Sequence, residues 1–183
     1  MRHPARWAAL AVGVVVAVLG IVLATQVGTN PQADIQTSRL VGQREPTFNA
    51  RTFDGQAVSS TGLAGRAVIV NFWNSWCIPC QQELPALKTF QEEHAADASV
   101  AFVGILRDDT VSVARAYASA TGMTWTLVGD PDSNLSLAFG TRGQPETFAI
   151  SPGGLIVGSQ IGPASVKNLD TMLAVGAIAT RPA

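Results

Sequence analysis

The chain has 183 residues, of which 47% are hydrophobic and 14% are charged, and its formal net charge is −1. No basic stripe is present, so nucleic-acid binding through the usual electrostatic route is not expected. Seven phenylalanines and four tryptophans can build a hydrophobic core, which excludes wholesale disorder. The only cysteines are Cys77 and Cys80, which excludes a small scaffold held together by several disulfides.

A long uncharged segment runs from Trp7 to Val27. As a helix, its 21 residues would extend roughly 31 Å at ~1.5 Å per residue, which matches the hydrocarbon core of a bilayer. Arg2 and Arg6 precede it, and the positive-inside rule places that end in the cytoplasm and the rest of the chain outside. The sequence therefore predicts a membrane anchor over residues 1–27 and a single-pass protein of a bacterial cell membrane.

A cleaved signal peptide is the alternative interpretation of this segment, with Val22 and Ala24 at the −3 and −1 positions of the cleavage site. Residues 28–44 are polar and poor in aromatic residues, which is typical of a linker. Residues 45–183 are expected to form one domain, because they show neither an internal repeat nor a low-complexity tract.

After the linker, strand-like and helix-like segments alternate. The expected strands are rich in β-branched and aromatic residues and lie at 48–53, 67–72, 100–106, 125–128, 147–150 and 155–160. Helices are expected over 81–94 and 111–120 and again after a capping Ser165. Asp108 and Asp109 are predicted to cap the helix over 111–120, with a catalytic role as the alternative. This alternation, with a hairpin between the last two strands, predicts an α/β fold with a mixed central sheet.

The motif Trp76-Cys77-Ile78-Pro79-Cys80 lies between a predicted buried strand and a predicted helix. The first thiol is therefore expected at a helix N-terminus, where unpaired N–H groups and the helix dipole stabilise a thiolate. The second thiol then lies one turn into the helix and can resolve a mixed disulfide. The motif predicts thiol–disulfide exchange, with an exposed attacking Cys77 and a shielded Cys80.

Three other interpretations of the cysteine pair stay open. A structural disulfide would stabilise little, because a loop of four residues closes almost no chain. A zinc site would need two further ligands, and the domain's only histidine, His94, is expected to be structural at a helix C-terminus. The two cysteines would otherwise be ordinary core residues, although their position between strand and helix favours redox chemistry.

Two stretches of the sequence resemble the membrane-anchored thioredoxin-like proteins of the TlpA/ResA/CcmG (DsbE) family. VIVNFWNSWCIPCQQELPAL is similar to the family's active-site signature, and FGTRGQPETFAISPGGLIVG is similar to its cis-proline segment and hairpin. The resemblance covers residues 42–178 and implies a thioredoxin-like fold with an N-terminal hairpin. The helix over 111–120 and the strand over 125–128 resemble the family's inserted αβ unit.

The resemblance also implies roles for residues around the cysteines. Pro145 would be the cis-proline that faces the CxxC loop, and the backbone of Gln144 would pair with a substrate strand. Glu146 would add negative charge at the groove mouth, with a plain surface residue as the alternative. Glu83 would relay protons to or from Cys80, with a solvated helix residue as the alternative.

The remaining substrate-binding residues are expected next to the thiols. Trp76, Ile78 and Pro79 would line the groove, although Trp76 would pack in the core in the alternative interpretation. Gln144 stands where the family more often has a small or β-branched residue. Because that side chain borders the CxxC pair, partner choice and reduction potential are expected to depend on it.

The resemblance implies an extracytoplasmic thiol–disulfide oxidoreductase that reduces the CxxCH cysteines of apocytochrome c before haem attachment. Electrons would come from a membrane thiol transporter of the CcdA or DsbD type. The redox group would be the Cys77–Cys80 disulfide itself, with no other cofactor and no metal. The protein is expected to be a monomer.

Two alternatives to this function stay open. An oxidase of exported protein thiols would use the same chemistry in the opposite direction, and only the reduction potential separates the two. A copper chaperone of the Sco type shares the fold but uses a longer cysteine spacing and a distant histidine, whereas no histidine follows His94 here. A peroxidase is disfavoured, because residues that normally activate a peroxidatic cysteine are absent.

Overall fold

The computed structural model describes residues 12–22 and 38–178, which belong to two separate units of the chain. In the first unit, residues 12–22 form a helix with exposed side chains. The predicted membrane span Trp7–Val27 reaches beyond the described residues at both ends. Among the helices of the described ranges, none combines the length and the apolar character needed to cross a membrane.

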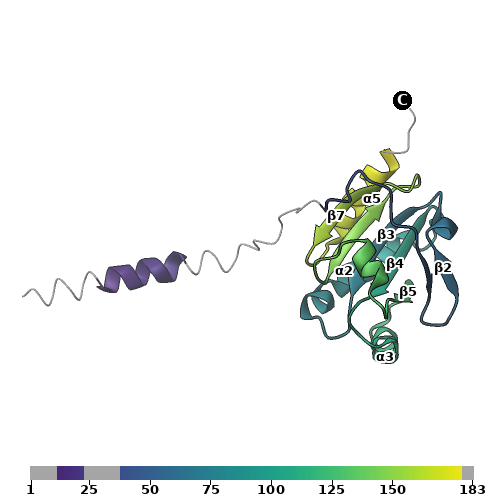
Figure 1. Cartoon of the computed structure of the whole chain (residues 1–183). Coiled ribbons are helices and arrows are strands. Elements are labelled where there is room, and N and C mark those ends of the chain that lie inside the picture. The colour runs from purple at the N-terminus through teal and green to yellow at the C-terminus, as the bar shows by residue number, and fades with distance from the viewer. Residues whose placement is uncertain (1–11, 23–37, 179–183) are drawn as a thin grey trace, which may run out of the picture. The chain divides into compact units, whose positions relative to one another are not determined.

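The second unit is built around a five-stranded sheet of order β5-β4-β3-β6-β7, preceded by a two-stranded hairpin (Figure 1). Strands β3, β4 and β5 run parallel, whereas β6 and β7 are antiparallel to their neighbours, which confirms the predicted mixed sheet. The strands are β1 (Asn49–Arg51), β2 (Ala57–Ser59), β3 (Ala67–Trp73), β4 (Val100–Leu106), β5 (Thr126–Gly129), β6 (Glu146–Ile150) and β7 (Ile156–Ile161).

The helical segments are η1 (Thr61–Leu63), α2 (Ile78–His94), α3 (Val111–Thr121), α4 (Asn134–Ala138) and α5 (Val166–Ile178). Ser165 caps α5, since its hydroxyl accepts the N–H of Asn168 at 3.3 Å. Helix α4 is not expected from the sequence pattern. It is short and held by Asp130, whose carboxylate accepts the N–H groups of Leu135 and Ser136 at 3.0 and 2.8 Å.

Apolar side chains cover both faces of the sheet. The alternation of side chains along each strand divides them into two clusters. One cluster packs under α2, α3 and α5 and includes Ile69, Leu87, Phe90, Phe102 and Leu169. The other packs under α4 and the N-terminal segment and includes Phe48, Phe72, Phe139, Phe148 and Ile156.

The packed part of the domain begins before residue 45, earlier than the predicted end of the linker. The backbone N–H of Ser38 donates to the hydroxyl of Ser159 at 2.9 Å, and Gly42 N–H donates to the Ile156 carbonyl at 2.8 Å. Arg44 forms a β-bridge with Leu155. Residues 38–44 therefore lie along β7, because its outer edge supplies backbone partners that composition alone does not reveal.

The parallel pairing of β3 and β4 decides where the site forms. Trp73 and Leu106, the last residues of the two strands, are opposite each other in the register. Because parallel strands end at the same edge of a sheet, the segments that follow them meet there. The CxxC motif follows β3, and residues 107–109 follow β4.

Candidate active site

The two cysteines lie where β3 gives way to α2. Cys77 is the N-cap residue of α2, and its sulfur accepts the Cys80 N–H at 3.1 Å. Cys77 and Cys80 form a disulfide with a Cα–Cα distance of 5.2 Å. The predicted position of the first thiol at a helix N-terminus is confirmed, so a Cys77 thiolate would face the unpaired N–H groups of the first turn.

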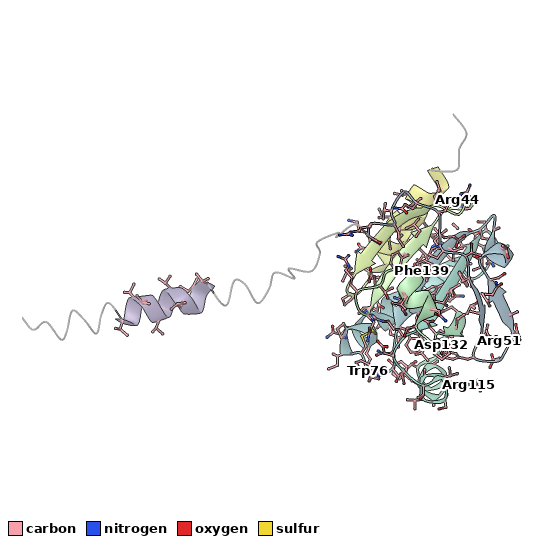
Figure 2. All side chains as sticks on the ribbon, viewed as in Figure 1. Arg44, Arg51, Trp76, Arg115, Asp132 and Phe139 are labelled. Carbon is pink, nitrogen blue, oxygen red and sulfur yellow. A yellow bond between two sulfur atoms is a disulfide. The ribbon has the colours of Figure 1, made fainter. Side chains whose placement is uncertain are left out.

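The expected contrast between an exposed Cys77 and a shielded Cys80 is wrong for this state of the protein. The two residues are only 5% and 7% exposed. Trp76 and Ile78 are 60% and 67% exposed instead. Figure 2 shows Trp76 at the surface of the domain. The core-packing alternative for Trp76 is therefore wrong, and apolar side chains flank the disulfide at the surface.

The cis-proline loop lies across the sheet edge from the CxxC loop. The Gln144–Pro145 peptide bond is cis, as predicted. Strand β6 begins one residue later at Glu146, which pairs with Phe72 of β3. Pro145 is therefore level with Trp73, the residue from which the chain enters the CxxC loop.

Glu83 is buried under the active site and has two hydrogen-bond donors. Its side chain is only 1% exposed, which rules out the solvated alternative. Asn71 Nδ2 donates to Oε1 at 2.9 Å, and the backbone N–H of Ala164 donates to Oε2 at 2.7 Å. Burial raises the pKa of Glu83 to about 7, although the bonds from Ala164 and Asn71 pull it down.

A small cavity joins Glu83 to the second cysteine. Cys80 and Glu83 both line it, together with Asn71, Trp73 and Tyr117 among others. Its volume is about 10 Å³, which is the space that one water molecule requires. Cys80 and Glu83 therefore lie beside the same small space under the active site.

Glu146 is also buried, which contradicts the surface-residue alternative. It is 1% exposed, and its Oε2 accepts the backbone N–H of Arg142 at 2.8 Å. Burial raises the pKa of Glu146, and the Arg142 N–H and the charges of Arg142 and Arg107 oppose that rise. Instead of standing at the groove mouth, Glu146 holds the cis-proline loop from beneath, because its position on β6 turns it into the domain.

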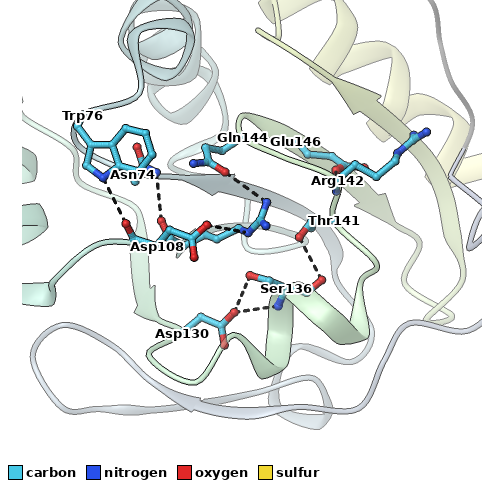
Figure 3. A network of polar contacts seen from close by, with 10 residues as sticks. Asn74, Trp76, Asp108, Asp130, Ser136, Thr141, Arg142, Gln144 and Glu146 are labelled. Carbon is cyan, nitrogen blue, oxygen red and sulfur yellow. Dashed lines mark hydrogen bonds and ion pairs between the residues drawn. The ribbon is translucent and has the colours of Figure 1, made fainter.

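The predicted capping roles of Asp108 and Asp109 are wrong. Thr110 is the N-cap of α3 and makes no side-chain capping bond. The Asp109 carboxylate turns toward the CxxC loop instead, and the Asp108 carbonyl accepts the indole N–H of Trp76 at 3.2 Å (Figure 3). The sequence motifs assign no role in the site to Arg107. Its position directly after a buried parallel strand is the sequence signal that places it there.

His94 has the structural position that the sequence predicts. It lies in the last turn of α2, and its Nε2 is 3.1 Å from Asp170 Oδ1 on α5. Within the described residues, one group of three side chains could hold a metal ion, namely Glu93, His94 and Asp170, and it includes neither cysteine.

The sheet has thioredoxin-like topology, and it places a CxxC pair at a helix N-terminus next to a cis-proline. This combination defines the protein as a thiol–disulfide oxidoreductase. The model of the AhpC/TSA family matches residues 41–159. The chain belongs to that family.

Known relatives confirm the resemblance seen in the sequence. Thiol:disulfide interchange protein DsbE of Pseudomonas fluorescens biotype C is 33% identical over 127 residues, which are 68% of each protein. Thiol-disulfide oxidoreductase ResA of Bacillus subtilis is 28% identical over 116 residues, covering 63% of this chain and 64% of ResA. A crystal structure of a thioredoxin-family thiol:disulfide interchange protein from Chlorobium tepidum TLS matches with a TM-score of 0.66 and 29% identity, covering 73% of this chain and 94% of that chain.

Proposed function

We propose that the protein reduces the disulfide of apocytochrome c during cytochrome c maturation, outside the cytoplasm of a bacterium. The observation that carries the proposal is the buried Glu83 that shares a cavity with Cys80. A carboxyl group with a pKa of about 7 is half ionised near neutral pH, so it can take a proton and return it. When the protein acts as a reductant, its resolving thiol must lose a proton before it attacks, and this carboxyl group can accept that proton.

The reaction consists of two exchange steps. The Cys77 thiolate attacks one sulfur of the substrate disulfide, which forms a mixed disulfide and releases the other substrate sulfur to take up a proton. Glu83 accepts the proton of Cys80, and the Cys80 thiolate then attacks the Cys77 sulfur. The substrate leaves with both sulfurs reduced, and the protein keeps the Cys77–Cys80 disulfide.

The surface around the disulfide suits an extended substrate. Trp76, Ile78 and Pro79 are exposed beside the cysteines and offer apolar contacts. The backbone of Gln144, directly before the cis-proline, is proposed to pair with the substrate strand. Glu146 then acts indirectly, by holding that loop through Arg142.

The oxidised protein must be reduced again before each turnover. We propose a membrane thiol transporter of the CcdA or DsbD type as the source of electrons and an N-terminal anchor over Trp7–Val27 that keeps a monomeric domain near it. The uncharged run after Arg2 and Arg6 supports this arrangement. A topology reporter fused after Ala183 should be active only outside the cytoplasm, and cytoplasmic activity would refute the proposed location.

The substrate proposal is tested with a peptide that contains Cys-Xaa-Xaa-Cys-His, supplied as its intramolecular disulfide. The reduced protein should reduce it faster than a peptide of the same composition in scrambled order. The Cys80→Ser variant should accumulate a mixed disulfide with the peptide. Equal rates with both peptides would count against an apocytochrome substrate while leaving the oxidoreductase chemistry intact.

The direction of electron flow follows from the reduction potential of the Cys77–Cys80 couple, equilibrated against a thiol buffer of known ratio. A potential more negative than that of the peptide couple is expected for a reductase. A more positive potential would favour the alternative, an oxidase of exported protein thiols.

A further inference from the structure

Asp109, which follows β4, holds the loop that leads into Cys77. Its Oδ2 accepts both the backbone N–H of Ser75 at 3.0 Å and the Ser75 hydroxyl at 2.6 Å. Its Oδ1 accepts the N–H of Thr110 at 2.7 Å, so both carboxylate oxygens are engaged. Hydrogen bonds to a carboxylate are about twice as strong as those between neutral groups, and the length of the hydroxyl bond is typical of this class.

The two residues before Asp109 contact the same loop through their backbone. The Arg107 carbonyl accepts Asn74 Nδ2 at 3.2 Å, and the Asp108 carbonyl accepts Trp76 Nε1 at 3.2 Å. Three consecutive residues of the segment 107–109 thus receive hydrogen bonds from three consecutive residues of the loop 74–76. The segment therefore fixes the backbone immediately before Cys77 and the orientation of the Trp76 ring.

The segment 107–109 also reaches the cis-proline loop. Arg107 Nη1 donates to Gln144 Oε1 at 3.3 Å, and Arg107 Nε lies 3.4 Å from Asp108 Oδ2 (Figure 3). Asp108 has φ of 54°, a left-handed conformation that is uncommon for residues other than glycine but is adopted more readily by aspartate than by most. The segment therefore links the loop that carries the nucleophile to the loop that faces it.

We propose that Asp109 is a positioning residue of thiol–disulfide exchange, which acts by holding Ser75 so that Cys77 faces the incoming disulfide. Exchange requires the attacking sulfur to lie in line with the bond that breaks, and a misplacement of about 1 Å can cost a reaction about 100-fold. Asp109 touches neither cysteine in this scheme. It acts through Ser75, and Arg107 keeps the cis-proline loop in register with the same segment.

The test measures the second-order rate at which the reduced protein attacks a small aromatic disulfide. Asp109→Asn should slow this reaction about 10-fold, because the uncharged amide accepts more weakly from Ser75 and turns an NH2 group toward the N–H of Thr110. Asp132→Asn is the matched control, since Asp132 is exposed and lies outside these contacts. The two variants should have the same far-UV circular dichroism spectrum, and all rates are measured well below the thermal midpoints.

Variants of Ser75 separate a positioning role from a general loss of stability. Ser75→Ala removes the hydroxyl and should slow the attack, whereas Ser75→Thr keeps the hydroxyl and should restore the parental rate. The double variant Ser75→Ala/Asp109→Asn should be no slower than Asp109→Asn alone, because both changes remove the same interaction. If the two effects multiply independently, the proposed route through Ser75 is wrong.

Two further outcomes would overturn the proposal. One is a rate for Asp109→Asn equal to that of Asp132→Asn. The other is a loss seen only with a peptide disulfide and not with the small aromatic one, since that result would assign Asp109 to substrate binding. Neither outcome bears on the apocytochrome proposal, because the small disulfide carries no recognition sequence.

Discussion

Two glutamates are buried to the same degree on opposite faces of one sheet, yet they have different neighbours. Glu83 and Glu146 are each 1% exposed. Asn71 donates hydrogen bonds to both Glu83 and Thr147, so Thr147 points to the face of the sheet on which Glu83 lies. Successive residues of a strand point to opposite faces, so Glu146, the neighbour of Thr147, faces away from Glu83. Glu83 shares a cavity with Cys80, whereas Glu146 binds the backbone of its own loop.

The comparison teaches that burial alone does not assign a chemical role. Burial is the main reason that the pKa of each carboxyl group is raised. Of the two, only Glu83 lines a cavity together with Cys80, and no arginine is among the groups that shift its pKa. We therefore expect Glu83 to move protons and Glu146 to hold the cis-proline loop, and each expectation is open to experiment.

The comparison presupposes that Cys80 is the resolving thiol, and this assignment carries the largest expected effect. Cys77→Ser should abolish disulfide exchange, because the attacking sulfur is gone. Cys80→Ser should still attack but should stop at the mixed disulfide. Non-reducing electrophoresis and mass spectrometry detect the adduct. Stable adducts through Cys80 in the Cys77→Ser variant would reverse the assignment and remove the basis for a proton relay at Glu83.

The next largest effect is expected for Glu83→Gln. The amide keeps the shape and cannot titrate, so resolution of the mixed disulfide should slow about 10- to 100-fold and lose its pH dependence near 7. The attack by Cys77 should be largely retained. Stopped-flow measurement of both steps tests this prediction over a pH range of roughly 5 to 9, because that range brackets the pKa of the carboxyl group.

Glu92→Gln is the matched control for that experiment, because Glu92 lies on the same helix and is exposed. It should leave both steps unchanged. A parental resolving rate in Glu83→Gln at every pH would make Glu83 an ordinary buried residue, and the contrast with Glu146 would disappear.

The raised pKa of Glu83 also predicts how stability changes with pH. The native state binds the Glu83 proton more tightly than the unfolded state, so the stabilisation is complete below about 4.5 and is lost as the pH rises through about 7. Relative to Glu83→Gln, the parental protein should lose about 1–3 kcal/mol of unfolding free energy over that interval. Urea titrations at several pH values measure the difference, and a difference that is constant with pH would refute the raised pKa.

The smallest effect is expected for Glu146→Gln. The amide oxygen can still accept the Arg142 N–H, so the loop should persist, and the exchange rate should fall only about twofold, the equivalent of ~0.4 kcal/mol. The pH dependence near 7 should remain, in contrast to Glu83→Gln. Loss of that dependence in Glu146→Gln would show that Glu146, rather than Glu83, carries the titration.

Much of the fold follows from local patterns in the sequence. Continuous β-branched runs predict β3 and β4, and Gly122, with φ of 72°, ends α3. Helix α4 escapes prediction because it is only five residues long and depends on Asp130 rather than on an apolar period. The start of the packed domain is missed because backbone pairing along β7 is not encoded in the composition of residues 38–44.

The site was only partly predictable for a similar reason. The cysteines lie in a motif that is read along the chain, and the resemblance to the family implies the positions of Glu83 and the cis-proline. Asp109 was assigned to helix capping, because an aspartate just before a helix commonly has that role. Its contact with Ser75 joins residues 34 positions apart, and only the parallel pairing of two strands brings them together.

The hydrogen bond from Ala164 to Glu83 gives the protein a built-in spectroscopic reporter. It connects residues 81 positions apart, and the donor is a single backbone amide just before α5. An amide proton that points at a carboxylate shifts downfield when the carboxylate ionises, because the acceptor becomes stronger. The Ala164 amide resonance of the oxidised protein would thus display the charge on Glu83 directly in NMR spectra, without a mutation.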